Sequence, residues 1–129
     1  MKICTACLSL ATPDLPRSRQ FYRALLGVSP EIVQADKYAE FRLTGLRLSI
    51  YASTHPDFKA SLGATGICLQ VDDLDDVLQR PVVSELTISP VREASHGREV
   101  DFCDPDGNRI IIHEPSAAFR EFLQLDART

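Results

Sequence analysis

The sequence predicts an α+β fold made of two βαβββ modules, and an internal duplication is the main reason for this prediction. Segment 7–15 resembles segment 66–74, because each is a strand-like run that ends in Asp-Leu, and segment 45–50 resembles segment 107–112. The two offsets, 66 − 7 = 59 and 107 − 45 = 62 residues, are nearly equal, which indicates two copies of one unit of about 60 residues. Apolar runs typical of strands and helices also follow the same order in each copy.

The length of 129 residues favours a single domain over residues 1–129. A chain of this length buries roughly two-thirds of its unfolded surface and needs no disulfide or metal for its stability. The parts of this domain are expected to be a first module at about 3–52, a linker at 53–65, a second module at about 66–114, and a tail at 115–129.

The first module is predicted to begin with a strand over 3–10, an apolar run that is too short for a helix. A helix follows, because Asp14 is a good N-cap, Pro16 suits the first turn, and Gly27 suits the position after the last turn. The remaining strands are expected to be an edge strand near Val33, a strand through Phe41 and Leu43, and a strand over 46–51 with alternating apolar and polar residues.

The second module is predicted to repeat this order, beginning with an alternating strand over 67–71. Asp73 caps a short helix that runs to about Gln79 and is broken near Pro81. An edge strand is expected over 87–91, a position where a proline is tolerated.

A hairpin completes the second module. Strands over 100–103 and 109–113 flank the segment Asp104-Pro105-Asp106-Gly107, a strong turn signal with Gly107 at a position of positive φ. In the tail, Phe119, Phe122 and Leu123 have the spacing of a short amphipathic helix.

Composition and charge exclude several classes of protein. Hydrophobic residues make up 44% and charged residues 25% of the chain, which is typical of globular proteins rather than disordered ones. The formal net charge of −4 offers no basic excess for a phosphate backbone, so we expect no nucleic-acid partner. No apolar run approaches the roughly 20 residues of a membrane helix, so we expect no membrane partner.

Four cysteines occur in the sequence, at positions 4, 7, 68 and 103. Cys4 and Cys7 have the spacing of a zinc or redox pair, but no second pair completes a tetrahedral site, so we interpret them as buried small hydrophobes. The N-terminal segment is not interpreted as a secretory leader, because it recurs inside the chain. A reduced, cytoplasmic protein is therefore expected.

Two motifs are similar to those of the vicinal oxygen chelate superfamily. Segment 21–27, which begins seven residues after Asp14, resembles its "D…FY…LG" helix, and segment 102–108 resembles its "F-x-DPDGN" hairpin. The superfamily includes glyoxalase I, extradiol dioxygenases, fosfomycin-modifying enzymes and bleomycin-binding resistance proteins. The resemblance covers about residues 3–115. It implies two modules whose mixed sheets curl into an open barrel around a ligand cup, with the helices on the outer face, and it implies a homodimer.

The resemblance also indicates where a metal would be bound. Enzymes of the superfamily hold a divalent metal through His, Gln or Glu at four positions, which correspond to Cys7, Ser49, Gly66 and Ile111 in this chain. Gly66 and Ile111 have no side-chain donor, whereas a Lewis-acid site needs about three protein ligands. We therefore expect no metal and no other cofactor.

If these four residues face the cup, the alternation along each strand places further residues beside them. The expected cup residues are Cys7, Ser9, Arg47, Ser49, Tyr51, Gly66, Cys68, Gln70, Arg109, Ile111 and His113, together with Thr5. The opposite, apolar face of the strands is expected to pack against the helices.

Several of these residues have two possible roles. Arg47 and Arg109 share one repeat position, and they are either rim residues paired with nearby carboxylates (Glu40, Glu99 or Asp101) or a pair of forks for a carboxylate or phosphate. His113 is either a buried, hydrogen-bonded histidine or a catalytic base. His55 and His96 lie in predicted loops and are expected to be solvated, with no reason to converge on His113.

The function favoured by these residues is the binding of a small organic molecule without metal, as in the bleomycin-resistance branch. An anionic molecule would satisfy both Arg47 and Arg109. The alternative is an enzyme of lyase, isomerase or dioxygenase type, with a relocated metal site or with metal-free acid–base chemistry that uses His113.

Overall fold

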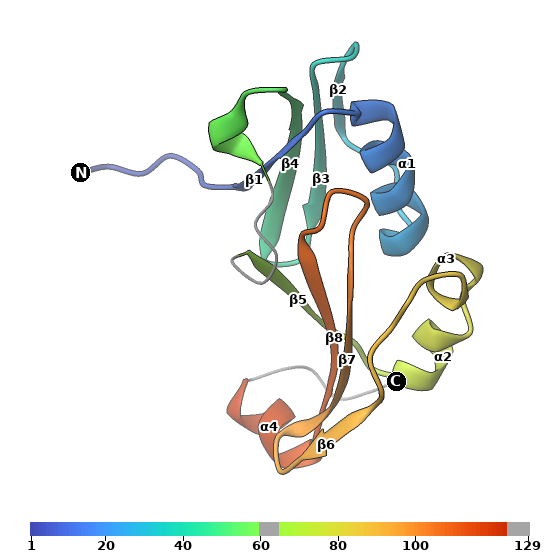
Figure 1. Ribbon diagram of the computed structural model, residues 1–129. Coiled ribbons are helices and arrows are strands. Elements are labelled where there is room, and N and C mark those ends of the chain that lie inside the picture. Colours follow the sequence, from blue (N-terminus) through green and yellow to red (C-terminus); the bar gives the residue numbers. More distant parts are fainter. Residues whose placement is uncertain (60–64, 124–129) are drawn as a thin grey trace. The chain divides into compact units, whose positions relative to one another are not determined.

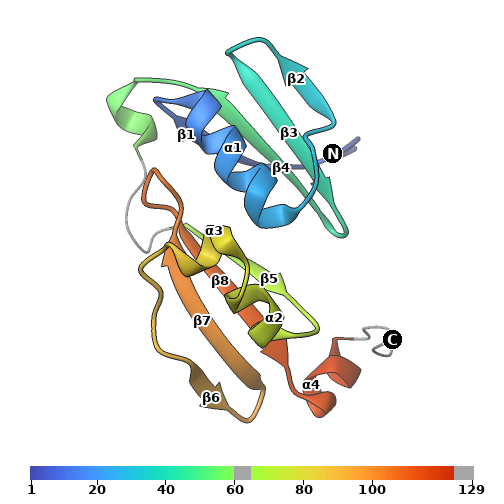
Figure 2. The same cartoon turned by 90° about the vertical axis from the view of Figure 1, so that its right-hand side faces the viewer.

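The computed structural model describes residues 1–59 and 65–123 and divides the chain into two units, Met1–Ser61 and Leu62–Thr129. In the first unit, helix α1 (Leu15–Leu26) lies across one face of a four-stranded sheet (Figure 2). The strands, in the spatial order β1-β4-β3-β2, are β1 (Leu8–Thr12), β4 (Leu46–Ala52), β3 (Tyr38–Leu43) and β2 (Ile32–Gln34), and a short 3-10 helix η1 (Pro56–Phe58) follows them (Figure 1).

The second unit has a sheet of the same design, with the spatial order β5-β8-β7-β6 (Figure 1). The strands are β5 (Gly66–Gln70), β8 (Arg109–Pro115), β7 (Gly97–Cys103) and β6 (Arg92–Ala94). The helices are α2 (Leu74–Leu78), α3 (Pro81–Ser84) and α4 (Ala117–Phe122). In both sheets the first strand of the unit pairs in parallel with the last strand, and the other neighbouring pairs are antiparallel.

The strand registers reproduce the duplication found in the sequence. Leu8 lies opposite Leu48 in the first unit, and Ile67 lies opposite Ile110 in the second. These two pairs are related by 67 − 8 = 59 and 110 − 48 = 62 residues, the same offsets that the sequence segments have. The α+β class and the two βαβββ modules are thus confirmed, while the open barrel around a cup stays a prediction.

Helix α1 forms where the capping residues predict it. Asp14 is the N-cap and accepts a hydrogen bond from the Arg17 amide (3.1 Å), and Gly27 ends the helix with a φ of 72°. The helix buries Leu15, Ser18, Tyr22 and Leu25. The Tyr22 ring lies 6.4 Å from the ring of Phe41 on β3, so this helix face packs on the sheet.

The second module contains a helix, α3, that was not predicted. Asp73 caps α2 as expected, with its carboxylate accepting from the Asp76 amide (3.2 Å), and the helix ends at Leu78 with Gln79 as its C-cap, so the predicted break before Pro81 is confirmed. Pro81 then begins α3, because a proline fits the first turn of a helix, where its missing N–H is not needed.

The predicted hairpin is present, and a buried carboxylate holds its turn together. Asp104 is buried and accepts from the amides of Asp106 (2.9 Å) and Asn108 (2.8 Å) and from the Asn108 side chain (2.8 Å). Gly107 adopts a φ of 91°, as the turn requires.

Two strand predictions were wrong in their bounds. β1 begins at Leu8 rather than at residue 3, and in its register residues 3–5 would extend past the start of its partner β4, where Gly45 makes the turn. The last edge strand is β6 at 92–94 rather than 87–91. Pro90 has no amide to pair, and the Asp101 amide donates to the Ser89 side chain (2.9 Å) instead of to a strand carbonyl.

The tail helix is confirmed as α4, and residues 124–129 of the predicted tail lie outside the described part of the chain. Among residues 1–59 and 65–123, no helix has both the length and the apolar character needed to cross a bilayer.

Replacing Gly97 tests the packing between β7 and the end of β8. Its φ is 139°, and a Cβ atom would overlap the Glu114 carbonyl oxygen and lie 2.9 Å from Pro115 Cα. Because these neighbours are backbone atoms that cannot move easily, we expect Gly97→Ala to lower the free energy of unfolding by about 2 kcal/mol or more. Urea denaturation measures this change.

Gly66→Ala is the matched control, since a Cβ there meets nothing within 4 Å and φ is not positive. Its free energy of unfolding should stay within about 0.5 kcal/mol of the parent protein. Equal losses in the two variants would contradict the packing described for Gly97.

Candidate functional site

The sheet face opposite α1 carries a polar network in the first unit. Phe41, Leu48 and Ile50 are buried, and the period of two along a strand puts their neighbours on the other face. There the Ser9 and Ser49 hydroxyl oxygens lie 2.6 Å apart, on the neighbouring strands β1 and β4. The face alternation predicted for Ser9 and Ser49 is therefore confirmed.

Cys7 adds a thiol to this network. Its Sγ lies 3.6 Å from the Ser9 hydroxyl and 3.6 Å from the Ser49 hydroxyl. These hydrogen bonds lower the pKa of the Cys7 thiol, and the one with Ser49 has the largest effect. The nearby Arg47 lowers this pKa further. The interpretation of Cys4 and Cys7 as buried residues was wrong, because both are exposed free thiols.

A buried carboxylate lies at the centre of the same face. Glu40 is only 1% exposed, and Arg47 Nη2 donates to both of its oxygens at 2.8 Å. Arg42 Nε donates at 3.3 Å and the Tyr38 hydroxyl at 2.9 Å. The hydrogen bonds from Arg47 lower the pKa of Glu40, although burial opposes this shift, so the carboxylate stays charged and fully bonded.

The second unit repeats the ion pair at the equivalent register position. Glu40 lies opposite Ser49, and Asp101 lies opposite Ile111. Arg109 Nη2 is 3.2 Å from Asp101 Oδ2, which Arg92 Nη1 also contacts at 2.7 Å.

The rim interpretation of the two repeat-related arginines is therefore confirmed. Arg47 pairs with Glu40 and Arg109 pairs with Asp101, both of which are among the carboxylates expected from the sequence. Each guanidinium group thus has a carboxylate partner, and the other interpretation, a pair of forks for an anion, stays a prediction.

His113 lies on the corresponding face of the second sheet, within a chain of hydrogen bonds. It is 4% exposed, its Nδ1 bonds Gln70 Oε1 on the neighbouring strand, and its Nε2 lies 3.0 Å from His96 Nδ1. The Gln70 oxygen can only accept, so His113 Nδ1 carries the hydrogen. Neutral His113 then accepts from His96 Nδ1–H, which leaves His96 Nε2 as the acceptor at the end of the chain.

His96 is an exposed turn residue, as expected, but the expectation that it would not converge on His113 was wrong. The β6–β7 turn folds back toward the end of β8, where the Ser116 amide donates to the His96 carbonyl oxygen (2.9 Å). Phe119 of α4 packs its ring edge-on against both imidazoles, with centroids 5.9 and 5.8 Å away. The sequence gives no periodicity for a turn residue, so no pattern could have placed His96 there.

Burial is the largest cause that lowers the pKa of His113, and the neighbouring His96 adds to the effect. Glu99, which lies opposite His113 on β7, acts in the other direction. His113 is therefore held neutral. Glu114 points to the opposite face, as expected, where it accepts from the Leu74 amide at the start of α2 (3.0 Å) and from Arg98 (2.9 Å).

The side chains at the superfamily's metal positions do not fit a divalent metal. In the first unit the side chains of Cys7 and Ser49 are hydrogen-bonded to each other. In the second unit the side chains of Gly66 and Ile111 supply no donor atom. Within the described ranges, no three His, Cys, Asp or Glu side chains are grouped so that they could hold a metal ion. Glu40 does not substitute for a missing ligand, because three donors already use its oxygens.

Glu40 was expected only as a possible partner of the rim arginines, not as a buried carboxylate with three donors, and no role was predicted for Tyr38. The sequence does indicate the orientation of Glu40. Phe41 is expected to face the core, and successive side chains of a strand alternate, so its neighbour Glu40 faces the other side. Tyr51, Gly66, Cys68 and Ile111 lie on strands as expected, whereas Thr5 and Cys7 precede β1, and the role of all the predicted cup residues in binding a ligand stays a prediction.

The sequence pattern of the Glyoxalase/Bleomycin resistance protein/Dioxygenase superfamily matches residues 5–112. A glyoxalase/bleomycin resistance protein from Catenulispora acidiphila is 28% identical, with a TM-score of 0.65 over 87% of this chain and 100% of that one. No curated protein matches the sequence.

More distant solved structures share the fold. The fosfomycin resistance protein FosX from Listeria monocytogenes, complexed with Mn(II) and sulfate, is 20% identical, with a TM-score of 0.71 over 96% of this chain and 99% of that one. Lactoylglutathione lyase from Agrobacterium tumefaciens is 18% identical, with a TM-score of 0.67 over 88% of this chain and 95% of that one.

The buried His113 makes stability depend on pH. Its pKa in the folded protein lies below the ordinary value of 6.5, so the unfolded chain binds the proton more readily. The neutral His113 therefore contributes to the free energy of unfolding above this value, and the contribution is lost as the pH falls through it. We expect urea unfolding to give a lower free energy of unfolding at about pH 5.5 than at about pH 7.5.

The variant His113→Asn should lose much of this pH dependence, because it removes the titrating ring. His55→Asn is the control, since His55 is exposed and belongs to the first unit. If His113→Asn and His55→Asn keep the same pH profile as the parent, His113 is not the buried group that titrates.

Proposed function

Because this chain belongs to the Glyoxalase/Bleomycin resistance protein/Dioxygenase superfamily, we propose that it binds a small organic molecule on the polar strand faces without the divalent metal of the superfamily's enzymes. The observation that carries the proposal is the donor set at the four metal positions. At two of these positions, Gly66 and Ile111, the side chain has no donor atom. The side chains at the other two, Cys7 and Ser49, are hydrogen-bonded to each other. A Lewis-acid site with about three protein ligands cannot be assembled from them.

The side chains on these faces favour an uncharged, polar ligand. Cys7, Ser9, Cys68 and Gln70 are exposed and offer a thiol, a hydroxyl, a second thiol and an amide. The charged groups beside them are already neutralised, since Glu40 is bonded by Arg47 and Asp101 by Arg109. An anion at Arg47 would have to compete with the buried Glu40 carboxylate, so an uncharged ligand is favoured over an anionic one.

Metal-free acid–base chemistry is the second candidate function, and the hydrogen-bonded pair of histidines favours it. Both ring nitrogens of His113 are engaged, by Gln70 and by His96. His96, which is exposed, would present the free Nε2 to a substrate, while His113 and Gln70 would orient it. In this proposal His113 is a positioning residue rather than the base itself.

The proposal also includes the homodimer that the resemblance implies and the cytoplasmic location that the unpaired cysteines favour. All four cysteines are free thiols, which suits a reducing compartment. In each sheet the outer strands are open edges of the kind that a second copy can cover.

A thermal-shift screen of neutral, anionic and cationic organic compounds tests the binding proposal. We expect neutral polar compounds to raise the Tm, because a ligand at about 100 times its Kd adds about 2.7 kcal/mol to the free energy of unfolding. Gln70→Ala should reduce the shift. Gln79→Ala is the matched control, since that glutamine is exposed at the end of α2 in the same unit.

Three results would contradict the proposal. One is the absence of any stabilising compound, and another is a shift that Gln70→Ala and Gln79→Ala leave equally unchanged. The third is elemental analysis that finds one tightly held metal ion per chain. If a stabilising compound is instead converted to product, and His96→Asn abolishes the conversion, the acid–base candidate replaces simple binding.

A further inference from the structure

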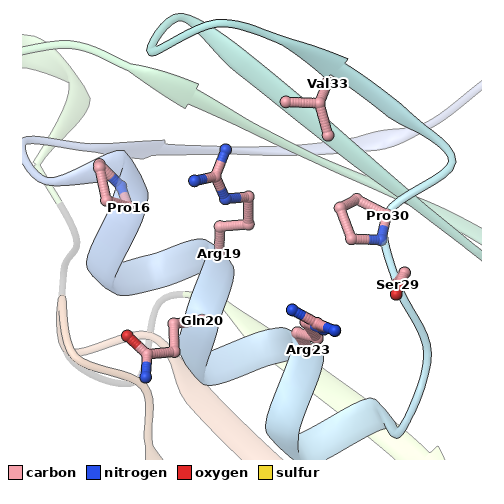
Figure 3. A pocket seen from close by; sticks show the side chains of 7 residues that line it. All are labelled: Pro16, Arg19, Gln20, Arg23, Ser29, Pro30 and Val33. Carbon is pink, nitrogen blue, oxygen red and sulfur yellow. The ribbon is translucent and has the colours of Figure 1, made fainter.

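The first unit has a pocket on the helix side of its sheet, on the face opposite the polar network of Ser9, Ser49 and Glu40. Its volume is about 580 Å³, and it lies between α1 and segment 29–33, which leads into β2 (Figure 3). The pocket exists because α1 packs over β4 and, through Tyr22, against Phe41 of β3. The edge strand β2 is left uncovered, and Val33 on it is 49% exposed.

Two arginines of α1 line this pocket. Arg19 and Arg23 are one helical turn apart, and the Arg19 side chain extends from the helix toward β2 (Figure 3). Pro30 and Val33 form an apolar wall on the other side, and Ser29 supplies a hydroxyl beside it. None of the described residues that line the pocket is acidic.

Arg19 and Arg23 differ from the other arginines of the described residues, because neither forms an ion pair there. The arginines that do form ion pairs are Arg17, Arg42, Arg47, Arg80, Arg92, Arg98, Arg109 and Arg120. In a chain of net charge −4, carboxylates are available for almost every guanidinium group. The two arginines without a carboxylate partner in residues 1–59 and 65–123 thus line the same pocket.

Local helix energetics do not account for this pair. A cation in the last turn interacts favourably with the helix dipole, which gives Arg23 a structural role. Arg19 lies in the middle of the helix, where that effect has faded. Two like charges at i and i+4 moreover repel each other and weaken a helix slightly. An anion between the two guanidinium groups would turn this repulsion into attraction.

We propose that this pocket binds a small organic oxyanion. Arg19 and Arg23 hold its carboxylate or phosphate group, because guanidinium forks match the geometry of both. Pro30 and Val33 contact the apolar body of the ligand, and the volume suits a molecule of metabolite size. This site is separate from the polar strand face, so the proposal does not depend on the function proposed above.

An NMR titration of the isotope-labelled protein tests this site with three probes. Benzoate and phenyl phosphate carry the two oxyanions on the same ring, and benzamide is the uncharged counterpart of benzoate. We expect the anions to shift the amide signals of α1 and segment 29–33, whereas benzamide leaves them in place. The tighter-binding anion identifies the preferred head group, and added salt should weaken its binding.

Variants assign the binding to the two arginines. Arg19→Gln and Arg23→Gln should each raise the Kd of the anion by about tenfold, because each removes one charge-assisted contact. Glutamine is a good helix former, and the dispersion of the spectrum verifies that the variants are folded. Arg80→Gln makes the same change of net charge in the second unit, at an exposed arginine paired with Asp76, and should leave the Kd unchanged.

The proposal would be overturned if benzamide bound as tightly as benzoate, or if the anions shifted signals only outside this pocket. Equal effects of Arg19→Gln, Arg23→Gln and Arg80→Gln would also overturn it, since the binding would then follow net charge alone. The variant Gln70→Ala distinguishes this pocket from the site on the polar strand face. It should not change the Kd of these anions, whereas it should weaken the binding of ligands to that face.

Discussion

The burial of one face of each sheet decides where the polar side chains of this protein lie. In the first unit, Phe41, Leu48 and Ile50 are almost completely buried. Successive side chains point to opposite faces of a strand, so Glu40, Arg47 and Ser49 must occupy the other face. A one-residue slip of β4 would exchange the two sets and place charged groups in the core. The apolar face therefore fixes the polar network as firmly as it fixes the fold.

The two modules keep the same framework and differ in the side chains on the polar face. Each has an arginine at the start of its last strand that pairs with a carboxylate on the strand before it, Arg47 with Glu40 and Arg109 with Asp101. Around these pairs the first module carries hydroxyls and a thiol, whereas the second carries the bonded side chains of Gln70, His113 and His96. Among the described residues, neither set brings together three His, Cys, Asp or Glu side chains that could hold a metal ion.

The sequence predicted those features of the fold that depend on local patterns. Asp14 and Gly27 mark the ends of α1 because capping depends on the residues at the helix ends themselves. The hairpin at Asp104 was predictable for the same reason. The start of β1 was not, because it depends on how far the partner strand β4 extends. The position of β6 depends on the Ser89 side chain, which takes the place of a strand carbonyl.

The candidate site was predictable only as a set of residues on one face. Alternation places Gln70 and His113 together, and the structure joins them by a hydrogen bond. Alternation alone cannot show whether an arginine on that face is free or paired with a carboxylate, because the pairing depends on the strand register. It also cannot place His96, which reaches His113 through a turn.

The pairing of the arginines explains why anion binding is expected on the helix side of the first sheet. Glu40 is 1% exposed, and a buried carboxylate without a cation would be costly, so Arg47 is committed to it. An incoming anion would have to compete with a partner that is already in place. Arg19 and Arg23 have no such partner among the described residues, and they stand on a helix that the apolar core holds through Leu15 and Tyr22. Their side chains are thus positioned by the fold, while their charge is left for a ligand.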